Sequence, residues 1–379
     1  MLKICSVSYS NEIRPLNLLD NKCLDIIGNN TGNLIFSKYF TNSLKDKFEY
    51  VQLHDLNIND SHTIFLLANF LRPTFSQEYS EKLLNFLNNM KNQITVVSIG
   101  CQADLENMNP KEYVKTLDNT VKKIAYKMSE KSVSIGVRGE FTYNVFKELG
   151  IKNVDLIGCP SWFVNGYNQK DVIKKEWDDN FNVAFYSCWE PYSEWHQKWH
   201  KKLLDEALKL KDTKFVLQSE FEYLPFYLKS KGYDISDEKY IDSLYKLSQH
   251  FGISVDNFMH NTRLSNLLEI FTNVSQWENF TKSRDLNFGF RIHGSIISLK
   301  QGIPALPIAP DSRISEFCDL FKIPYIKVNT ISSEQFNLRN FYENADFSQM
   351  NKVYTRLLEN YISFLNKNGI SHNFSNKIV

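Results

Sequence analysis

The sequence predicts an α/β fold built from two doubly wound domains that face each other. The chain has 379 residues, of which 42% are hydrophobic and 23% charged. This composition is ordinary for a globular protein, and the length allows two domains. Short, solidly apolar runs alternate with longer amphipathic stretches, which is typical of parallel sheets covered by helices on both faces. The alternation stops at a polar, charge-rich stretch, 165–180, and then starts again.

Five apolar runs in the first half predict strands, and three amphipathic stretches predict helices. The stretch 110–128, for example, places Val114, Leu117 and Val121 on one face. Gly150 comes near the end of another helical pattern, where glycine is a common C-cap. The predicted strands are 3–9, 63–69, 94–100, 132–138 and 153–158, and the predicted helices are 78–90, 110–128 and 141–151.

The second half repeats this pattern after the linker. We therefore expect an N-terminal domain over 1–165, a C-terminal domain over 181–345, and a closing helix and tail over 346–379. Because ligands bind beyond the carboxyl ends of parallel strands, two such domains place a cleft between their sheets. The predicted strands are 182–187, 214–219, 286–291 and 305–310, and the predicted helices are 193–210, 239–251, 264–274, 311–321 and 351–368.

Charge and cysteine usage exclude several classes of protein. The net charge is +1 and the pI is about 7.6, so nothing drives the chain toward nucleic acid. The six cysteines are widely spaced and form no C-x-x-C pair, which favours free thiols in a reducing compartment. The first residues predict a short strand rather than a signal peptide, and the apolar run 63–71 is too short to span a membrane. We expect a soluble, cytoplasmic protein.

The segment 288–317 carries the most informative side chains. Arg291 and His293 lie two residues apart on what the pattern predicts to be an extended segment, so both would point to the same side. Arginine matches carboxylate and phosphate groups with its planar fork, and histidine titrates near neutral pH. The pair therefore indicates an anion site with a proton-transfer group beside it. A salt bridge at the strand end with a core histidine remains the alternative.

Two further arginines have positions near the predicted cleft. Arg138 ends the predicted strand 132–138 and would face the cleft, although it could instead cap a neighbouring loop. Asp311 is predicted to cap the helix that follows it. Arg313, in the first turn of that helix, would either reach the cleft or pair with Glu316.

Small-residue turns after the predicted strands add weaker candidates for ligand contact. Asn30, Gly32 and Asn33 precede a helical run, whose backbone N–H groups could cradle an anion. Their spacing matches neither G-x-G-x-x-G nor a P-loop, so a plain strand–helix turn is the alternative. Gly100 and Gln102 lie in a similar turn, predicted at the rim of the cleft.

The helix predicted at 193–210 is rich in histidine, tryptophan and lysine. His196 and His200 have an i, i+4 spacing, but no H-E-x-x-H motif or acidic ligand accompanies them, so we predict surface histidines and no metal site. Trp189, Trp195 and Trp199 could stack on sugars or rest on lipid headgroups, although packing on their own domain is the simpler interpretation.

Taken together, these motifs resemble the polysaccharide pyruvyl transferase family. The resemblance rests on GNNTGN, SIGCQ, SIGVRGEFTYNVFKELGI with GCPSWF, and above all FGFRIHGSIISLKQGIPALPIAPDSRISEFCDLFKIP. Their order and spacing fit the family from about residue 25 to residue 327. One departure is Gly139, where many relatives have aspartate.

The resemblance implies two Rossmann-like domains in a GT-B-like arrangement. It implies that phosphoenolpyruvate is the donor and that a sugar diol in surface polysaccharide biosynthesis, such as an exopolysaccharide or capsule precursor, is the acceptor. Arg138, Arg291 and His293 would form the phosphoenolpyruvate site beside the backbone of Ile292. No cofactor is implied, because phosphoenolpyruvate is the donor substrate. The acceptor would be a saccharide or a lipid-linked oligosaccharide, which leaves peripheral association with the inner face of the membrane open.

The residues themselves agree with this chemistry. Phosphoenolpyruvate carries a carboxylate and a phosphate, which two arginines from opposite domains could bind, and His293 is the candidate acid/base. A GT-B glycosyltransferase that uses a nucleotide sugar is the alternative, but no E-x-x-x-x-x-x-E pattern for ribose binding is found. A non-catalytic saccharide-binding relative is a third possibility, against which the intact arginines and histidine argue. The sequence does not indicate an oligomeric state.

Overall fold

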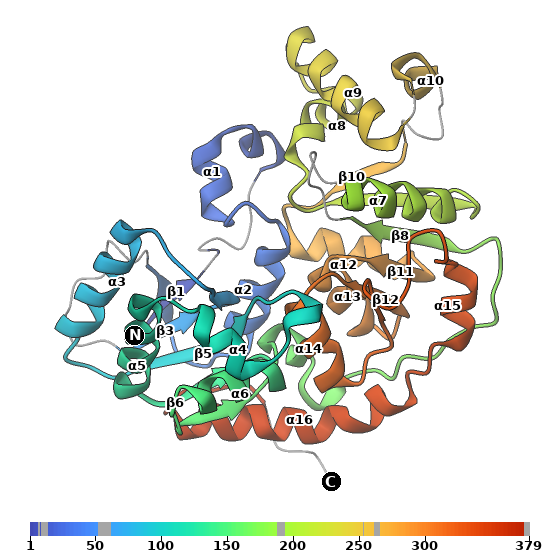
Figure 1. Ribbon diagram of the computed structural model, residues 1–379. Coiled ribbons are helices and arrows are strands. Elements are labelled where there is room, and N and C mark those ends of the chain that lie inside the picture. The colour runs from blue at the N-terminus through green and yellow to red at the C-terminus, as the bar shows by residue number, and fades with distance from the viewer. Residues whose placement is uncertain are drawn as a thin grey trace.

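The computed structural model describes residues 1–6, 8, 14–51, 62–187, 194–252, 254–260 and 266–374. Two parallel sheets with helices on both faces confirm the predicted fold class of two doubly wound α/β domains (Figure 1). We call the part that carries the first sheet the N-terminal domain and the part that carries the second the C-terminal domain.

The first sheet has the order β2-β1-β3-β5-β6-β7, and β4 pairs with β5. Every residue of its long central strand β5 is buried, as expected for a parallel strand covered on both faces. The strands are β1 (Leu2–Ser6), β2 (Phe48–Tyr50), β3 (Thr63–Leu66), β4 (Asn69–Leu71), β5 (Ile94–Cys101), β6 (Ser132–Val137) and β7 (Val154–Leu156).

The second sheet has the order β10-β9-β8-β11-β12-β13, which is the 3-2-1-4-5-6 order of dinucleotide-binding domains. Its strand order reverses between β8 and β11, and ligands bind at such a switch point. The strands are β8 (Asn182–Tyr186), β9 (Asp212–Leu217), β10 (Leu268–Ile270), β11 (Leu286–Gly289), β12 (Ala305–Ala309) and β13 (Ile326–Lys327).

Helices cover both sheets and connect their strands. In the N-terminal domain and the connection that follows it they are η1 (Pro15–Leu19), α1 (Asn21–Ile26), α2 (Gly32–Asn42), α3 (Gln77–Asn89), η2 (Leu105–Asn107), α4 (Pro110–Thr116), α5 (Asn119–Lys131), α6 (Glu140–Glu148), η3 (Pro160–Phe163) and η4 (Gly166–Asn168). In the C-terminal domain they are α7 (Glu194–Ala207), η5 (Phe221–Tyr223), α8 (Leu224–Ser230), α9 (Asp237–Phe251), α10 (Val255–His260), α12 (Val274–Lys282), α13 (Ile292–Leu299), α14 (Ser312–Phe321), α15 (Leu338–Asn344) and α16 (Ser348–Lys367).

The last long helix, α16, joins the two domains. It leaves the C-terminal domain and runs back beneath β6 of the N-terminal domain (Figure 1). A Cβ atom at Gly136 of β6 would lie only 2.9 Å from Cζ of Phe364 on α16. This close packing ties the end of the chain to the first sheet.

A second contact between the domains packs α2 against α13 and α12. The hydroxyl of Tyr39 on α2 donates a hydrogen bond of 2.6 Å to Oε1 of Glu278 on α12. The same carboxylate pairs with Lys300, whose Nζ lies 4.2 Å from the centroid of the Tyr39 ring. Just before α2, the N–H of Thr31 donates to the carbonyl of Gln218 over 2.8 Å. These contacts fix the start of α2 against the C-terminal domain.

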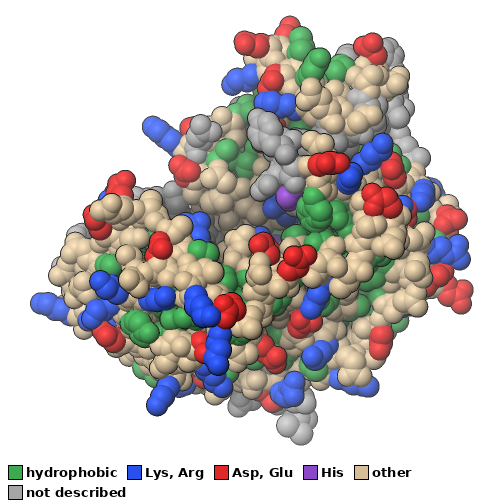
Figure 2. All heavy atoms as spheres, viewed as in Figure 1, with side chains coloured by type: hydrophobic (Ala, Val, Ile, Leu, Met, Phe, Trp, Pro, Cys, Tyr) green, Lys and Arg blue, Asp and Glu red, His purple; other side chains and the backbone are tan. Residues whose placement is uncertain are grey.

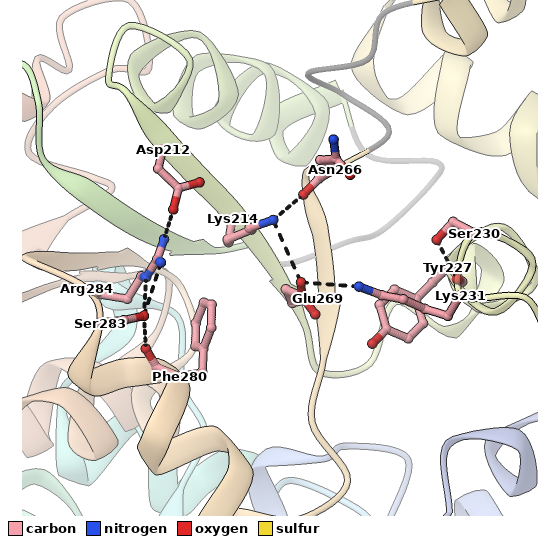
Figure 3. Close-up of polar contacts among 10 residues, drawn as sticks. All are labelled: Asp212, Lys214, Tyr227, Ser230, Lys231, Asn266, Glu269, Phe280, Ser283 and Arg284. Atoms are coloured by element: carbon pink, nitrogen blue, oxygen red, sulfur yellow. Dashed lines mark hydrogen bonds and ion pairs between the residues drawn. The ribbon is translucent and has the colours of Figure 1, made fainter.

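Two predicted helices differ from those in the structure. The helix predicted at 264–274 is wrong, because 268–270 form strand β10, and residues 264 and 265 lie outside the described residues. Glu269 of β10 forms ion pairs with Lys214 at 3.8 Å and with Lys231 at 3.5 Å (Figure 3). These partners are distant in sequence, so no local pattern announces the strand.

The helix predicted at 110–128 is broken in the middle. It divides into α4 and α5 because Leu117 and Asp118 take extended backbone angles. The N–H of Asp118 bonds the carbonyl of Pro73 at 2.8 Å, outside any helix. The apolar face predicted for one helix is therefore shared by two.

Removing the interdomain hydrogen bond of Tyr39 should destabilise the docked domains. We expect Tyr39→Phe to lower the free energy of unfolding by about 1.5–3 kcal/mol, because the bond to Glu278 has a charged acceptor. Denaturant unfolding measures the change. Tyr126→Phe is the control, since its hydroxyl bonds the carbonyl of Leu149 within one domain and its side chain is exposed. An equal loss in both variants would contradict a special role for the interdomain bond.

Candidate active site

The switch point of the second sheet carries Arg291. The chain turns at Gly289, whose φ of +123° suits glycine, and a Cβ atom there would lie 2.0 Å from the carbonyl oxygen of Tyr186. Arg291 is the N-cap of α13, and His293 already belongs to the helix. The prediction that both lie on an extended segment is therefore wrong, because the strand ends earlier, at Gly289.

The guanidinium of Arg291 is held by polar groups at the ends of β8 and β9. Its Nε donates to the carbonyl of Ser187 over 2.8 Å, and its Nη2 donates to Oγ of Ser219 and, over 2.5 Å, to Oε1 of Glu220. The Glu220 side chain is fully buried and also accepts the backbone N–H groups of Gln218 and Ser219. Arg291 is thus paired in the structure while about a fifth of its side chain stays exposed to the cleft.

His293 lies in the first turn of α13 and is almost completely buried. Its ring centroid is 5.7 Å from that of Phe36 on α2. Its Nε2 has no hydrogen-bond partner among the described residues. Burial, and then the charge of Arg138, lower the pKa of His293 to about 3. Near neutral pH the imidazole is therefore uncharged, with one ring nitrogen left for a ligand.

Arg138 follows β6 and is also buried, with 4% of its surface exposed. Its Nε and Nη2 lie 3.3 Å and 3.4 Å from Oγ of Ser98. Ser98 has a φ of +61°, a backbone conformation that costs free energy for a residue other than glycine. The ring of Phe36 lies 5.5 Å from Cζ of Arg138, so Phe36 contacts both Arg138 and His293. The structure thus brings Arg138 and His293 together from opposite domains around Phe36, although Arg138 is buried and does not line the cleft.

The turn before α2 completes this inner part of the site. A Cβ atom at Gly32 would lie 2.5 Å from Oε1 of Gln218 and 3.2 Å from Nδ1 of His293, so any other residue would have to displace the Gln218 side chain. Asn30 accepts the N–H of Gly32 over 2.8 Å, and Asn33 donates to the carbonyl of Ile27 over 2.9 Å. Both asparagine side chains thus stabilise the turn, and Gly32 permits the close approach of the domains.

Gln218, Glu220 and Phe36 were not predicted as site residues. The side chain of Gln218 is buried, and its Nε2 has no partner among the described residues. One signal was available: a polar run, Gln-Ser-Glu, directly follows the apolar strand β9. No signal marked Phe36, which looks like any core residue of an amphipathic helix.

Arg291 and Ser219 line an open cleft of about 640 Å³ between the domains, whereas Arg138 and His293 lie buried and are not part of its lining. Figure 2 shows the surface hollowed there, with charged side chains on its rim. Both domains contribute to its lining, the N-terminal domain with Gln102, Asp104, Leu105, Glu106 and Asn107 and the C-terminal domain with Trp195, His196, Ser219, Arg291, Pro310, Asp311, Arg313, Val328 and Asn329.

Two positions were predicted for Arg313, in the cleft or paired with Glu316. The structure places it in the lining of the cleft. Its Nε donates to Oδ2 of Asp311 over 2.7 Å. Asp311 also accepts the N–H of Arg313, which confirms it as the cap of α14. Gly100 is buried in β5, where a Cβ atom would lie 2.9 Å from the carbonyl oxygen of Ala68. It therefore packs beneath the surface of the cleft and does not line it.

The histidines and tryptophans of α7 have different positions. His200 is buried, so the predicted surface position is wrong. Its Nδ1 forms a hydrogen bond with Oγ of Ser187, the residue that follows β8. Trp199 is buried against Phe290, whereas Trp195 is half-buried and lines the cleft. Trp189 lies outside the described residues.

The described part of the chain contains no group of three or more histidine, cysteine or acidic side chains placed to hold a metal ion. Within the same residues, no helix combines the length and the apolar character that crossing a membrane requires.

Comparison with known proteins adds one strong match. The family model "Polysaccharide pyruvyl transferase" matches residues 17–312, which is most of the chain. Comparison with curated proteins finds no match.

Solved structures resemble the chain only weakly. Anabaena Alr3699/HepE, solved in complex with UDP and glucose, is 10% identical with a TM-score of 0.41, over 97% of this chain and 95% of the other. WaaG, a glycosyltransferase involved in lipopolysaccharide biosynthesis, is 9% identical with a TM-score of 0.37, over the same shares of the two chains. These scores support no argument, so the fold assignment rests on the strand order of the two sheets.

The buried, neutral His293 should make stability depend on pH. Its pKa is lowered in the folded protein, so it contributes stability above its ordinary pKa and loses this contribution as the pH falls. From about pH 7 to about pH 5, we expect the wild type to lose roughly 2 kcal/mol more unfolding free energy than His293→Gln. Denaturant unfolding at both pH values measures the difference. Identical pH dependence in the two proteins would show that His293 is not held neutral.

Proposed function

Because the chain belongs to the polysaccharide pyruvyl transferase family, we propose that it transfers the pyruvyl group of phosphoenolpyruvate to two hydroxyls of a sugar. The product is a pyruvate ketal on a saccharide, and phosphate is released. One observation carries the proposal: Arg138 and Arg291 come from opposite domains, and His293, whose Nε2 has no hydrogen-bond partner among the described residues, is close enough to Arg138 for that charge to lower its pKa.

The two arginines suit the charges of the donor. Phosphoenolpyruvate carries a carboxylate and a phosphate on a three-carbon frame, and guanidinium groups bind both with paired hydrogen bonds. Arg291 keeps part of its side chain exposed to the cleft, and the side chain of Arg138 makes only the long hydrogen bonds to Ser98 among the residues that the structure describes. Each charge-assisted bond to the donor would contribute about 1.5–3 kcal/mol.

Ketal formation requires a proton at C3 of the donor and an oxygen at C2. The first sugar hydroxyl forms the C2–O bond and loses its proton, while C3 takes up a proton and becomes a methyl group. The C2–O bond to phosphate then breaks, and phosphate leaves with the electron pair. The second hydroxyl attacks C2 and closes the ring, and its proton leaves with the phosphate.

We assign the proton transfer to His293. Its imidazole is neutral in the structure, with Nε2 unpaired among the described residues, so it can accept a proton. An anionic donor beside it would raise its pKa, because a negative charge favours the protonated ring. Binding of phosphoenolpyruvate would thus prepare His293 to protonate C3, a role usually worth about 10²- to 10⁴-fold in rate.

We place the acceptor in the outer part of the cleft. Trp195 offers an indole face, and Gln102, Asp104 and Glu106 offer hydrogen-bonding groups from the facing domain. Aromatic faces with polar side chains around them are suited to sugar rings. The open cleft admits a saccharide or a lipid-linked oligosaccharide, and we place the reaction in the cytoplasm.

Donor binding provides the first test. We expect phosphoenolpyruvate to raise the melting temperature of the wild type and Arg291→Lys to weaken binding at least about tenfold, because lysine keeps the charge beside Glu220 but lacks the fork. Arg284→Lys is the control, since Arg284 pairs with Asp212 away from the cleft (Figure 3). A shift with a nucleotide sugar and none with phosphoenolpyruvate would favour a glycosyltransferase instead.

Turnover separates binding from chemistry at His293. We expect His293→Ala to retain phosphoenolpyruvate binding within a few-fold and to lose about 10²-fold or more in phosphate release with a saccharide acceptor. Calorimetry gives the binding constant, and a phosphate-release assay over a panel of saccharides gives the rate. If binding disappears together with turnover, His293 is a contact to the donor and its acid/base role is wrong.

A further inference from the structure

Glu316 reaches from the C-terminal domain to the first turn of a helix in the N-terminal domain. It belongs to α14, and its side chain is buried. Its Oε2 accepts the backbone N–H of Thr142 on α6, and its Oε1 accepts the Thr142 hydroxyl, each over 2.9 Å. The same hydroxyl accepts the N–H of Cys101 at the end of β5 over 2.9 Å. One carboxylate thus connects α14, α6 and β5.

Helix α6 has no cap of its own. Its N-cap residue is Gly139, which has no side chain to accept the free N–H groups of the first turn. A Cβ atom at Gly139 would lie 2.6 Å from both Cβ and Cγ of Glu316 and 2.7 Å from its Oε2. The φ of Gly139 is −159°, which any residue adopts. Position 139 must be glycine because Glu316 occupies the space that a side chain would need. The Glu316 carboxylate accepts the N–H group that an N-cap side chain would otherwise accept.

The cap lies next to Arg138. Gly139 directly follows Arg138 in the chain, and a Cβ atom at Gly100 would lie 3.5 Å from Oε1 of Glu316 and 3.6 Å from Cδ of Arg138. The two side chains thus approach the same point from opposite domains. Arg138 is buried, so a nearby negative charge offsets the cost of keeping its guanidinium charged.

We propose that Glu316 is a positioning residue that caps α6 from the opposite domain and thereby holds Arg138 in place for the donor. Domain docking and the donor site then depend on the same pair of hydrogen bonds. The proposal rests on the proposed function only in taking the ligand of Arg138 to be phosphoenolpyruvate.

The charges around Glu316 give this arrangement a pH dependence. Burial raises the pKa of Glu316 to about 7, the bonds from Thr142 and the charge of Arg138 oppose the rise, and Asp311 adds to it. The other titratable groups facing it are the buried thiol of Cys101 and the phenol of Tyr113. An anionic donor at Arg138 would raise the pKa of Glu316 further. Donor binding near pH 7 should therefore take up protons through Glu316.

A compensating pair of substitutions tests the cap. Glu316→Ala removes the carboxylate, and Gly139→Asp places a carboxylate at the same N-cap but collides with Glu316. We expect each single variant to lower the melting temperature and to raise KM for phosphoenolpyruvate at least about tenfold, because each disturbs the backbone beside Arg138. The double variant should recover most of both losses, because the introduced aspartate then fills the space that Glu316 left. A double variant as impaired as the worse single one would overturn the proposal.

Proton uptake separates positioning from simple stabilisation. Calorimetry of phosphoenolpyruvate binding near pH 7, in two buffers of different ionisation enthalpy, should show smaller uptake for Glu316→Gln than for the wild type. Glu206→Gln is the matched control, because Glu206 is a buried carboxylate that accepts the N–H of Leu338 at the start of α15, away from the cleft. It should lower the melting temperature and leave KM and proton uptake unchanged. If the KM of Glu206→Gln for phosphoenolpyruvate shifts as much as the KM of Glu316→Gln, Glu316 acts through stability alone.

The proposal and the proposed function fail in different ways. If the wild type does not bind phosphoenolpyruvate, the proposed function is wrong, while recovery of the melting temperature in the double variant still supports the cap. If the wild type binds and turns over phosphoenolpyruvate but the double variant recovers neither property, the function stands and the role of Glu316 is wrong.

Discussion

The two domains approach each other closely where Gly32 begins α2. A Cβ atom there would lie 2.5 Å from Oε1 of Gln218 and 3.2 Å from Nδ1 of His293, so glycine lets the domains meet here without displacing either side chain. At this distance Phe36 contacts both Arg138 and His293, and His293 loses most of its contact with water. Its low pKa follows from that burial and from the charge of Arg138. The charge state of His293 therefore depends on the close packing of the two domains around it.

Each arginine of the site has a buried carboxylate close to it. Arg291 pairs with Glu220 within its own domain, whereas Arg138 has Glu316 nearby from the other domain. An unpaired charge in such a place would cost several kcal/mol, so these carboxylates keep the empty site stable. A dianionic donor must compete with them for the arginines. This competition lowers the affinity for the donor, but the carboxylates hold the arginines in position before the donor binds.

Much of the fold could be predicted from the sequence because each buried parallel strand consists of a short run of apolar residues. Each strand predicted in this way is present, although residues 7 and 9 of the first lie outside the described residues. The exceptions have tertiary causes: β10 forms because its residues pair with β9, and the helix predicted at 110–128 breaks where Asp118 bonds Pro73. Strand pairing and a bond to a distant loop leave no periodic signal in the segments themselves.

The amino-acid sequence alone determines which reactive side chains the site has and at which strand ends they lie. Arg138 and Arg291 each stand at the end of a predicted strand, and their residue type indicates an anion site. Which groups meet is set by the folded arrangement: Arg313 pairs with Asp311, Gln218 approaches Gly32, and Glu316 caps α6. The physical reason is that burial and pairing set the charge and position of a side chain. Both depend on residues that lie far apart in the chain, such as Thr142 and Glu316.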